Sequence, residues 1–433
     1  MKVLKFGGTS VGSSTNIKSV SSIILRERAK ITVLSAMSGT TDALVRIVNE
    51  SQANRTITNE IKFIKDKYYK CIKSLIIDNQ EKAEKAVDDV INLLKKTSEN
   101  YDNKSSEGII LSQGELLTTA IFTLYLKECG KKAELINILD MMRLNKNGIV
   151  DEEYLKNSIT KHIEKFSDDT IFVTQGFICK NADGIITNLG RGGSDYSAAL
   201  IGAGISASQV QIWTDIDGMH NNDPRYVEGT KPISHLSFDQ AAELAYFGAK
   251  ILHPATALPC KHAGIPVYLK NTMEPDAVGT VISVEDNFLN TYQAVAAKDN
   301  ITLIRINSTR MLMAYGFLRK VFEIFEEYKT PIDMITTSEV AVSLTIDNDK
   351  NLKAIVKKLE ELGTIEIEKT NSIVCVVGVF DHEHCGIISN LMAGLKDVPV
   401  KMISYGASDR SIAILISSDN KIQSLKALNN HLF

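Results

Sequence analysis

Short β-forming runs alternate with amphipathic helical patterns through about the first 290 residues, and this alternation restricts the fold more than any other feature. Val87, Val90, Ile91 and Leu94, for example, follow the i, i+3, i+4, i+7 spacing of one helix face. Strands separated by helices predict an α/β domain with a mostly parallel sheet between helices. The runs with the composition of strands are 3–6, 31–35, 134–138, 171–174, 210–214 and 266–269.

The segment from about residue 59 to residue 103 is rich in Lys and Glu, a composition that is also found in coiled coils. Apolar residues recur at helical spacing on each side of the segment, but polar residues 78–84 interrupt the stripe. We therefore expect two ordinary surface helices rather than one long coiled coil.

The last part of the chain, about 140 residues, has an order of elements that occurs twice. The first copy has the βαββαβ order of a ferredoxin-like unit. Its predicted elements lie at 301–306, 317–328, 331–335, 340–346, 352–362 and 364–368. The order begins again at 373–379, 386–395, 400–404, 411–416 and 420–428. The second copy lacks a final strand, so either the chain ends early or the two copies share strands.

Charge and cysteine usage restrict the class of protein. Lys plus Arg number 49 and Asp plus Glu number 52, and the net charge of −3 argues against a nucleic-acid binder held by a broad basic field. The six cysteines are scattered without a CxxC pair, which is typical of reduced, cytosolic proteins. No signal peptide or apolar run of about 18 residues is present. We expect a soluble, cytoplasmic protein with no nucleic-acid or membrane partner.

The segment KFGGTS, residues 5–10, directly follows the first predicted strand. Two glycines let the backbone approach a ligand closely, and a helix that begins near Ser13 would offer free N–H groups to an anion. Lys5 adds a positive charge, so the segment suits a phosphate. A glycine pair after a strand is also a common tight turn, and the GxxxxGK[ST] pattern of a P-loop is absent.

The segment NLGRGGSD, residues 188–195, precedes a predicted helix of small residues. Arginine in a glycine-rich loop can hold a carboxylate or phosphate through two parallel hydrogen bonds, which makes Arg191 a candidate anion ligand. Asp195 lies in the first turn of the predicted helix, where it could instead be a simple cap.

Three further segments carry candidate side chains. Thr214 and Asp215 end a predicted strand, where α/β sheets bind ligands, although NDPR at 222–225 is also ordinary turn chemistry. Lys250 has apolar neighbours in the sequence, so a buried charge there would need an anionic partner. LSQGE at 111–115 is predicted to be a glycine turn between a strand and a helix, with Glu115 as its carboxylate.

These signals are individually modest, but their order is specific. KFGGTSV, LSAMSGTTD, LSQGE, TQGF, LGRGGSDYSAAL, WTDIDG, NDPR and FGAKILHP follow one another along the chain. In this order they resemble the aspartate kinases of the amino-acid-kinase family, from residue 1 to about residue 290. The two C-terminal repeats resemble the paired ACT modules of the same enzymes. The resemblance implies a kinase domain at 1–292, a first ACT domain at 293–370 and a second at 371–433.

The resemblance further implies transfer of the ATP γ-phosphoryl group to the β-carboxylate of L-aspartate, the first step towards lysine, threonine and methionine. That carboxylate is already ionised at pH 7, so catalysis must come from positioning and charge neutralisation rather than from a general base. The residues implied as catalytic are Lys5, Asp195 and Lys250. The residues implied at ATP are Lys5, Gly7, Gly8, Thr9, Ser10, Thr214, Asp215, His220, Arg225, Lys250 and Ile251.

The acceptor set implied by the resemblance is Ser35, Thr41, Glu115, Arg191, Gly193 and Ser194. Arg191 would hold the α-carboxylate of aspartate, Glu115 its ammonium, and Asp195 would orient Lys5. Mg²⁺ is expected on phosphate oxygens and water, so no protein ligand for a metal is named. His220 departs from the family, because many relatives carry Tyr there.

The ACT modules imply a homodimer or homotetramer and an effector amino acid, for which L-lysine is the prediction. The implied effector residues are Met311, Ala314, Phe317, Leu318, Ile332, Asp333, Thr337 and Ser338. Ala314 departs from the lysine-regulated relatives, which often carry Ser at this position. The alternative for this part of the chain is a dimerisation module that binds no ligand.

Two other functions compete with aspartate phosphorylation. One is a kinase for a different anion, such as glutamate, carbamate, acetylglutamate or a nucleotide. The other is a catalytically silent amino-acid sensor, which the repeats allow but which the set of Lys5, Arg191, Asp195 and Lys250 disfavours. ADP release that depends on L-aspartate would separate these functions.

Overall fold

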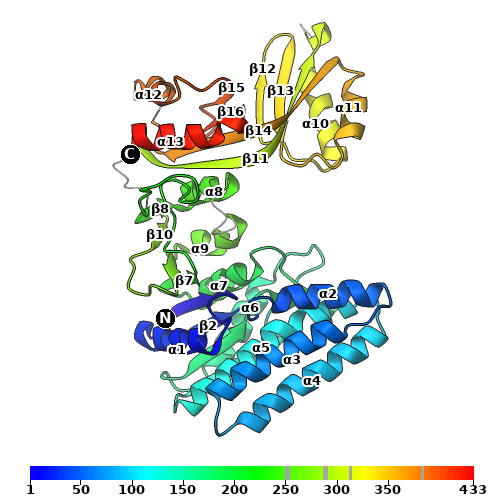
Figure 1. Ribbon diagram of the computed structural model, residues 1–433, viewed down its shortest axis with the longest axis vertical. Coiled ribbons are helices and arrows are strands. Elements are labelled where there is room, and N and C mark those ends of the chain that lie inside the picture. Colours follow the sequence, from blue (N-terminus) through cyan, green and yellow to red (C-terminus); the bar gives the residue numbers. More distant parts are fainter. Residues whose placement is uncertain (249–253, 286–290, 312–314, 382–384) are drawn as a thin grey trace. The chain divides into compact units, whose positions relative to one another are not determined.

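The computed structural model describes residues 1–248, 254–285, 291–311, 315–381 and 385–433 (Figure 1). The chain divides into two compact units. The first comprises Met1–Met219, Ser234–Phe238 and Leu252–Asp286, and the second comprises His220–Ile233, Asp239–Ile251 and Asn287–Phe433. This division follows packing rather than chain order, so the predicted domain boundaries stay predictions.

An eight-stranded sheet forms the centre of the first unit. Its strands pair in parallel except for β9 with β10, which confirms the predicted mostly parallel sheet. In the order in which they lie side by side, the strands are β3 (Ala133–Ile136), β4 (Ile171–Gln175), β2 (Ile31–Leu34), β1 (Lys2–Phe6), β7 (Gln209–Thr214), β9 (Val267–Asn271), β10 (Thr280–Ser283) and β8 (His235–Ser237).

Helices and short connections complete the first unit. The helices are α1 (Ser14–Glu27), α2 (Thr40–Gln52), α3 (Thr58–Leu75), α4 (Gln80–Glu99), α5 (Ser106–Glu128), α6 (Glu152–Ile163), α7 (Gly193–Gly204) and α9 (Leu258–Ala263). The 3₁₀ turns are η1 (Ile138–Asp140) and η2 (Pro254–Ala257), and a separate hairpin joins β5 (Ile178–Lys180) to β6 (Ile186–Asn188). The Lys/Glu-rich segment forms the two helices α3 and α4, as predicted.

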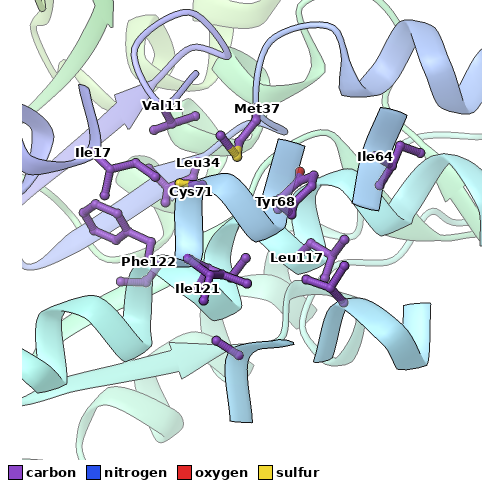
Figure 2. Close-up of a cluster of buried hydrophobic side chains, with 14 of the residues drawn as sticks. Val11, Ile17, Leu34, Met37, Ile64, Tyr68, Cys71, Leu117, Ile121 and Phe122 are labelled. Atoms are coloured by element: carbon purple, nitrogen blue, oxygen red, sulfur yellow. The ribbon is translucent and has the colours of Figure 1, made fainter. Parts of the chain in front are cut away.

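One apolar core joins helices α1 to α5 to strands β1, β2, β3, β4 and β7. Figure 2 shows part of it, including Ile17 of α1, Leu34 of β2 and Phe122 of α5. Tyr68 on α3 is completely buried in it, and its hydroxyl contacts the Thr118 hydroxyl at 3.0 Å and the Gly114 carbonyl at 3.3 Å. The buried hydroxyl of this tyrosine therefore has hydrogen-bond partners, as buried polar groups generally do. Helix α5 is long and apolar enough to cross a membrane by composition, but 72% of that stretch is buried inside the protein, so it is a core helix.

The second unit is built on a six-stranded sheet with the order β12-β13-β11-β14-β16-β15. Its strands are β11 (Tyr292–Asn307), β12 (Met334–Thr337), β13 (Ala341–Ile346), β14 (Thr364–Gly378), β15 (Val400–Ser404) and β16 (Ser411–Ser417). Its helices are α8 (Phe238–Tyr246, whose first residue is assigned to the first unit), α10 (Phe317–Glu327), α11 (Leu352–Leu359), α12 (Ile387–Gly394) and α13 (Lys421–Leu432). Two 3₁₀ turns, η3 (Thr309–Met311) and η4 (Ser418–Asn420), complete it.

Long strands β11 and β14 explain the final strand that the second repeat lacks in sequence. The later part of β11 pairs with β13 and the early part of β14, which completes the first βαββαβ copy. The early part of β11, from Tyr292 to Lys298, pairs with the later part of β14 and serves the second copy. Each copy has its own apolar core. The two ferredoxin-like units therefore share two continuous strands, which is the second of the alternatives left open by the sequence.

Candidate active site

The glycine-rich loop after β1 is fixed by close backbone packing. The N–H of Gly7 donates to the Trp213 carbonyl at 3.2 Å, and a Cβ on Gly8 would lie 2.8 Å from the Ala36 carbonyl oxygen. Only glycine fits such an approach. Helix α1 then begins at Ser14, close to the predicted start near Ser13, and the Ser13 side chain accepts from the N–H of Asn16 as the N-cap.

Lys5 and Asp195 form an ion pair between β1 and the first turn of α7. Their Nζ and Oδ1 atoms lie 2.6 Å apart, and the side chains are only 11% and 14% exposed. Helix α7 has Gly192 at its N-cap without a side-chain cap. Asp195 therefore meets the lysine charge instead of acting as a simple cap.

The prediction of a glycine turn at LSQGE is wrong, because residues 111–115 lie inside α5. Gly114 is there for packing: a Cβ at this position would lie 2.7 Å from the Ala36 Cβ. The close approach brings the Glu115 carboxylate to the Ala36 N–H, at 3.2 Å. Burial raises the pKa of Glu115 to about 7, and its Oε2 atom has no hydrogen-bond partner among the residues that the structure describes.

A pocket of about 370 Å³ collects the predicted acceptor residues. Across it, the Ser35 hydroxyl donates to the Ser194 hydroxyl at 3.0 Å. Arg191 lies on the exposed rim, and no carboxylate in the described part of the chain pairs with its guanidinium. The predicted residues that line the pocket are Lys5, Gly8, Ser35, Thr41, Glu115, Arg191, Gly193, Ser194 and Asp195. Folding thus brings together side chains from β1, α2, α5 and α7 that are far apart in sequence.

The predicted ATP residues divide into two groups in the first unit. Ser10 is buried and its hydroxyl contacts Thr272 at 2.7 Å, so it braces the loop against the end of β9. Thr214 ends β7 and its hydroxyl donates to the Asp215 carboxylate at 2.9 Å. Both groups lie at the carboxyl ends of neighbouring parallel strands, the edge where α/β sheets bind ligands.

Four other predicted ATP or catalytic residues are not among the described residues of the first unit. His220 and Arg225 belong to the second compact unit. The Arg225 guanidinium pairs with Asp223 at 2.6 Å, and a ring nitrogen of His220 lies 2.9 Å from the Thr230 hydroxyl. Lys250 and Ile251 lie outside the described residues.

The predicted effector residues surround the start of α10 and strand β12 in the second unit. Phe317 opens α10 and is buried, Leu318 follows it, and Met311 lies in η3. Thr337 ends β12 and Ser338 follows it on the surface, while Ile332 and Asp333 precede the strand. Ala314 lies outside the described residues.

The Asp333 carboxylate is occupied by groups of its own chain. Its side chain is 0% exposed, Lys298 Nζ lies 2.9 Å away, and the Tyr246 hydroxyl donates to it at 2.5 Å. Burial raises the pKa of Asp333. The sequence predicted this carboxylate but neither partner, because Lys298 and Tyr246 lie far from it along the chain.

Phe177 is a pocket residue to which the sequence assigned no role. It belongs to TQGF, one of the segments that carry the resemblance to the family. What distinguishes Phe177 in the structure is its backbone angle φ of +70°, which is uncommon for an aromatic residue. No pattern in the sequence predicts a positive φ at a phenylalanine.

Comparisons with known proteins cover the whole chain. Residues 1–271 match the amino acid kinase family and residues 374–432 match the ACT domain. Aspartokinase 1, chloroplastic, of Arabidopsis thaliana is 33% identical over 461 residues, covering 100% of this chain and 80% of that protein. The crystal structure of E. coli aspartokinase III in complex with aspartate and ADP is 30% identical, with a TM-score of 0.84 and 100% of both chains covered. That enzyme in complex with lysine and aspartate is 31% identical, with a TM-score of 0.80, covering 100% of this chain and 99% of that chain.

Proposed function

This chain belongs to the aspartokinases of the amino acid kinase family, and we propose how its pocket transfers the ATP γ-phosphoryl group to the β-carboxylate of L-aspartate. The convergence of Lys5, Glu115 and Arg191 on one pocket carries the proposal. Their charges match a phosphoryl group, an ammonium and an α-carboxylate. The product is 4-phospho-L-aspartate, the first intermediate towards lysine, threonine and methionine.

Each end of the acceptor has a complementary group in this proposal. The Oε2 atom of Glu115 accepts from the ammonium of aspartate, and the guanidinium of Arg191 holds its α-carboxylate in a two-point contact. Neither this Oε2 atom nor the guanidinium has a partner within the described part of the chain. Ser35, Thr41, the Gly193 backbone and Ser194 line the space between them. The β-carboxylate is then directed towards Lys5 and the glycine-rich loop.

The reaction must bring the aspartate carboxylate close to the negatively charged ATP phosphates. The positive charge of Lys5 reduces the repulsion between these two anions. Asp195 holds the Lys5 ammonium in place, while the Gly7, Gly8 and Thr9 backbone faces the phosphates. In this proposal Thr214 and Asp215, at the end of β7, face the nucleotide. His220, Arg225, Lys250 and Ile251 stay predicted ATP residues. Mg²⁺ would be held by phosphate oxygens and water and would neutralise part of the phosphate charge. In the part of the chain that the structure describes, no group of three or more His, Cys, Asp or Glu side chains is placed to hold a metal.

Regulation by L-lysine is the second part of the proposal. Support comes from the E. coli relative that was crystallised with lysine and aspartate, and from the ACT match at residues 374–432. The effector would lie near the start of α10 and β12, with a homodimer or homotetramer formed through the ACT modules. We place the enzyme in the cytoplasm.

Trapping the product tests the catalytic proposal directly. An acyl phosphate reacts with hydroxylamine to give a hydroxamate, so MgATP and L-aspartate should yield aspartyl hydroxamate. Glutamate, carbamate and acetylglutamate are offered in parallel, and Arg191→Lys serves as the matched variant, because it keeps the charge and loses the planar fork. Hydroxamate from glutamate and none from aspartate would refute the acceptor assignment. An unchanged KM for aspartate in Arg191→Lys would remove Arg191 from the acceptor site.

A further inference from the structure

The turn between β4 and β5 contains a strained residue at the wall of the acceptor pocket. Phe177 has φ +70°, and the N–H of Ile178 donates to the carbonyl of Gly176 at 2.8 Å across it. These features define a γ-turn with a positive central φ, which is a rare and unfavourable conformation for a residue with a side chain. Glycine would make the same turn without strain.

Helix ends do not explain this angle. Arg28 is the C-cap of α1, and Asn54, Ser206 and Lys329 each follow the end of a helix, where left-handed residues are common. Phe177 instead lies between two strands and lines the pocket. Strain of this kind persists only where the surrounding structure fixes it, and it gathers at functional sites.

The Phe177 backbone is tied to the Arg191 loop on both sides of the arginine. Its carbonyl accepts from the N–H of Leu189 at 2.8 Å. Its N–H donates to the Ser197 hydroxyl at 3.0 Å, and that hydroxyl donates to the Gly193 carbonyl at 2.8 Å. Leu189 and Gly193 lie two residues before and two residues after Arg191.

The ring and the preceding glycine add a steric brace. A Cβ on Gly193 would lie 2.9 Å from the Phe177 ring, and a Cβ on Gly176 would lie 2.7 Å from the Ser194 Cβ. The turn is therefore packed against the first residues of α7, which also carry Asp195. Arg191 itself has no ion pair among the described residues, so its position depends on this loop.

We propose that Phe177 is a positioning residue for the acceptor: its γ-turn and ring hold the Arg191 loop so that the guanidinium meets the α-carboxylate of aspartate. The inference rests on the proposed role of Arg191. This role accounts for an aromatic residue at a position where glycine would be unstrained. Glycine would form the same turn but would lose the ring that packs against Gly193.

Steady-state kinetics with separate KM values for aspartate and MgATP test this role. Phe177→Gly should raise the KM for aspartate at least tenfold and leave the KM for MgATP within twofold, while Phe177→Tyr, which keeps the ring, should stay near wild type. Ser197→Ala cuts only the hydroxyl relay and should raise the KM for aspartate several-fold. Arg28→Gly is the control, since it relieves a left-handed residue away from the pocket and should change neither KM.

A double-mutant cycle with Arg191→Lys shows whether Phe177 acts through the arginine. Phe177→Gly should raise the KM for aspartate much less in the Arg191→Lys background than in wild type. Fully multiplicative effects, an unchanged KM for aspartate in Phe177→Gly and Ser197→Ala, or equal rises in both KM values with a lowered Tm would overturn the inference. If Arg191→Lys alone has no effect, the proposed role of Arg191 fails, which is a separate result.

Discussion

Lys5 is the residue with the most direct part in the proposed transfer. It is nearly buried and paired with Asp195 at 2.6 Å, so its charge is fixed rather than mobile. We expect Lys5→Ala to lower kcat by about 10²–10³, since losing one donor to charge that develops in the transition state costs this much. ATP affinity should fall much less. Single-turnover rates and ATP titrations measure the two effects.

Lys2 provides the matched control on the same strand. It pairs with Glu27 at 3.0 Å and is 33% exposed, so Lys2→Ala removes a similar charge outside the pocket. We expect kcat close to wild type. A folded Lys5→Ala protein with an unchanged single-turnover rate would rule out the role of Lys5.

Glu115 predicts a pH dependence of aspartate binding. Burial raises its pKa to about 7, and only the ionised carboxylate can accept from an ammonium. Below that pH, binding must also remove a proton, so the KM for aspartate should rise by up to about tenfold per pH unit. Glu115→Gln should show a high KM with little change across the same range. A wild-type KM that stays constant between pH 5.5 and pH 7 would contradict this assignment.

The carboxyl group of Glu115 also makes the free energy of unfolding depend on pH. Its folded pKa lies above the reference value of 4.5, so the folded state binds the proton more tightly. The stabilisation is present below pH 4.5 and is lost as the pH rises towards about 7. Glu115→Gln should therefore reduce the loss of stability over this range, which thermal unfolding at several pH values would show.

Some site residues could be predicted from sequence and others could not, for physical reasons. Lys5, Arg191 and Asp195 stand in ordered motifs whose glycines are required by close backbone contacts. The pairing of Asp333 with Lys298 depends on β11 and β12 meeting β13 from opposite sides. The strain at Phe177 depends on neighbours from α7 and from the loop before it. Neither the Asp333–Lys298 pair nor the angle at Phe177 can be predicted from neighbouring residues in the sequence alone.

Among the elements, α5 is the one where the structure contradicts a local prediction. Glycine is a poor helix former, so LSQGE suggested a turn, but tertiary packing against Ala36 decided the structure. The six strands predicted in the first unit, which are β1, β2, β3, β4, β7 and β9, end within two residues of their predicted bounds, because buried parallel strands form continuous apolar runs. Strands β5, β6, β8 and β10 were not predicted. The sharing of β11 and β14 between two copies could be stated only as an alternative, because strand pairing is a long-range property.

Gly114→Ala tests that packing. Helix propensity favours alanine by about 1 kcal/mol, whereas forcing a methyl group to 2.7 Å from the Ala36 Cβ costs about 1–3 kcal/mol. We expect net destabilisation, together with a higher KM for aspartate, because Ala36 holds Glu115. Gly204→Ala in α7 is the control, since its Cβ would lie 3.5 Å from the nearest atom. Denaturant unfolding should show a loss for Gly114→Ala and no loss for Gly204→Ala.

At the scale of the whole molecule, the two repeats suit a regulatory role. Each copy keeps its own core, while β11 and β14 run through both, so continuous backbone joins the two copies. An effector can use such a coupling only if it binds one state of the enzyme better than the other. Regulation therefore has to be tested as a change in activity together with binding.

We expect L-lysine to inhibit the enzyme, with a coupling of about 1–3 kcal/mol between the effector and substrate sites. An effector ammonium would compete with Lys298 for the Asp333 carboxylate. Asp333→Ala should therefore keep its activity without lysine and lose most of the inhibition.

Asp347→Ala is the matched control for this prediction. Asp347 pairs with the same Lys298 at 2.8 Å but is not a predicted effector residue, so inhibition should persist. Activity is titrated with lysine, threonine and methionine for the three proteins, and lysine binding is measured by calorimetry. Inhibition by threonine alone would overturn the effector and leave the kinase assignment intact. Binding of none of the three would favour a dimerisation module, because a ligand-free ACT pair can still join two chains. Equal loss of inhibition in both variants would assign the effect to Lys298 rather than to contact between Asp333 and the effector.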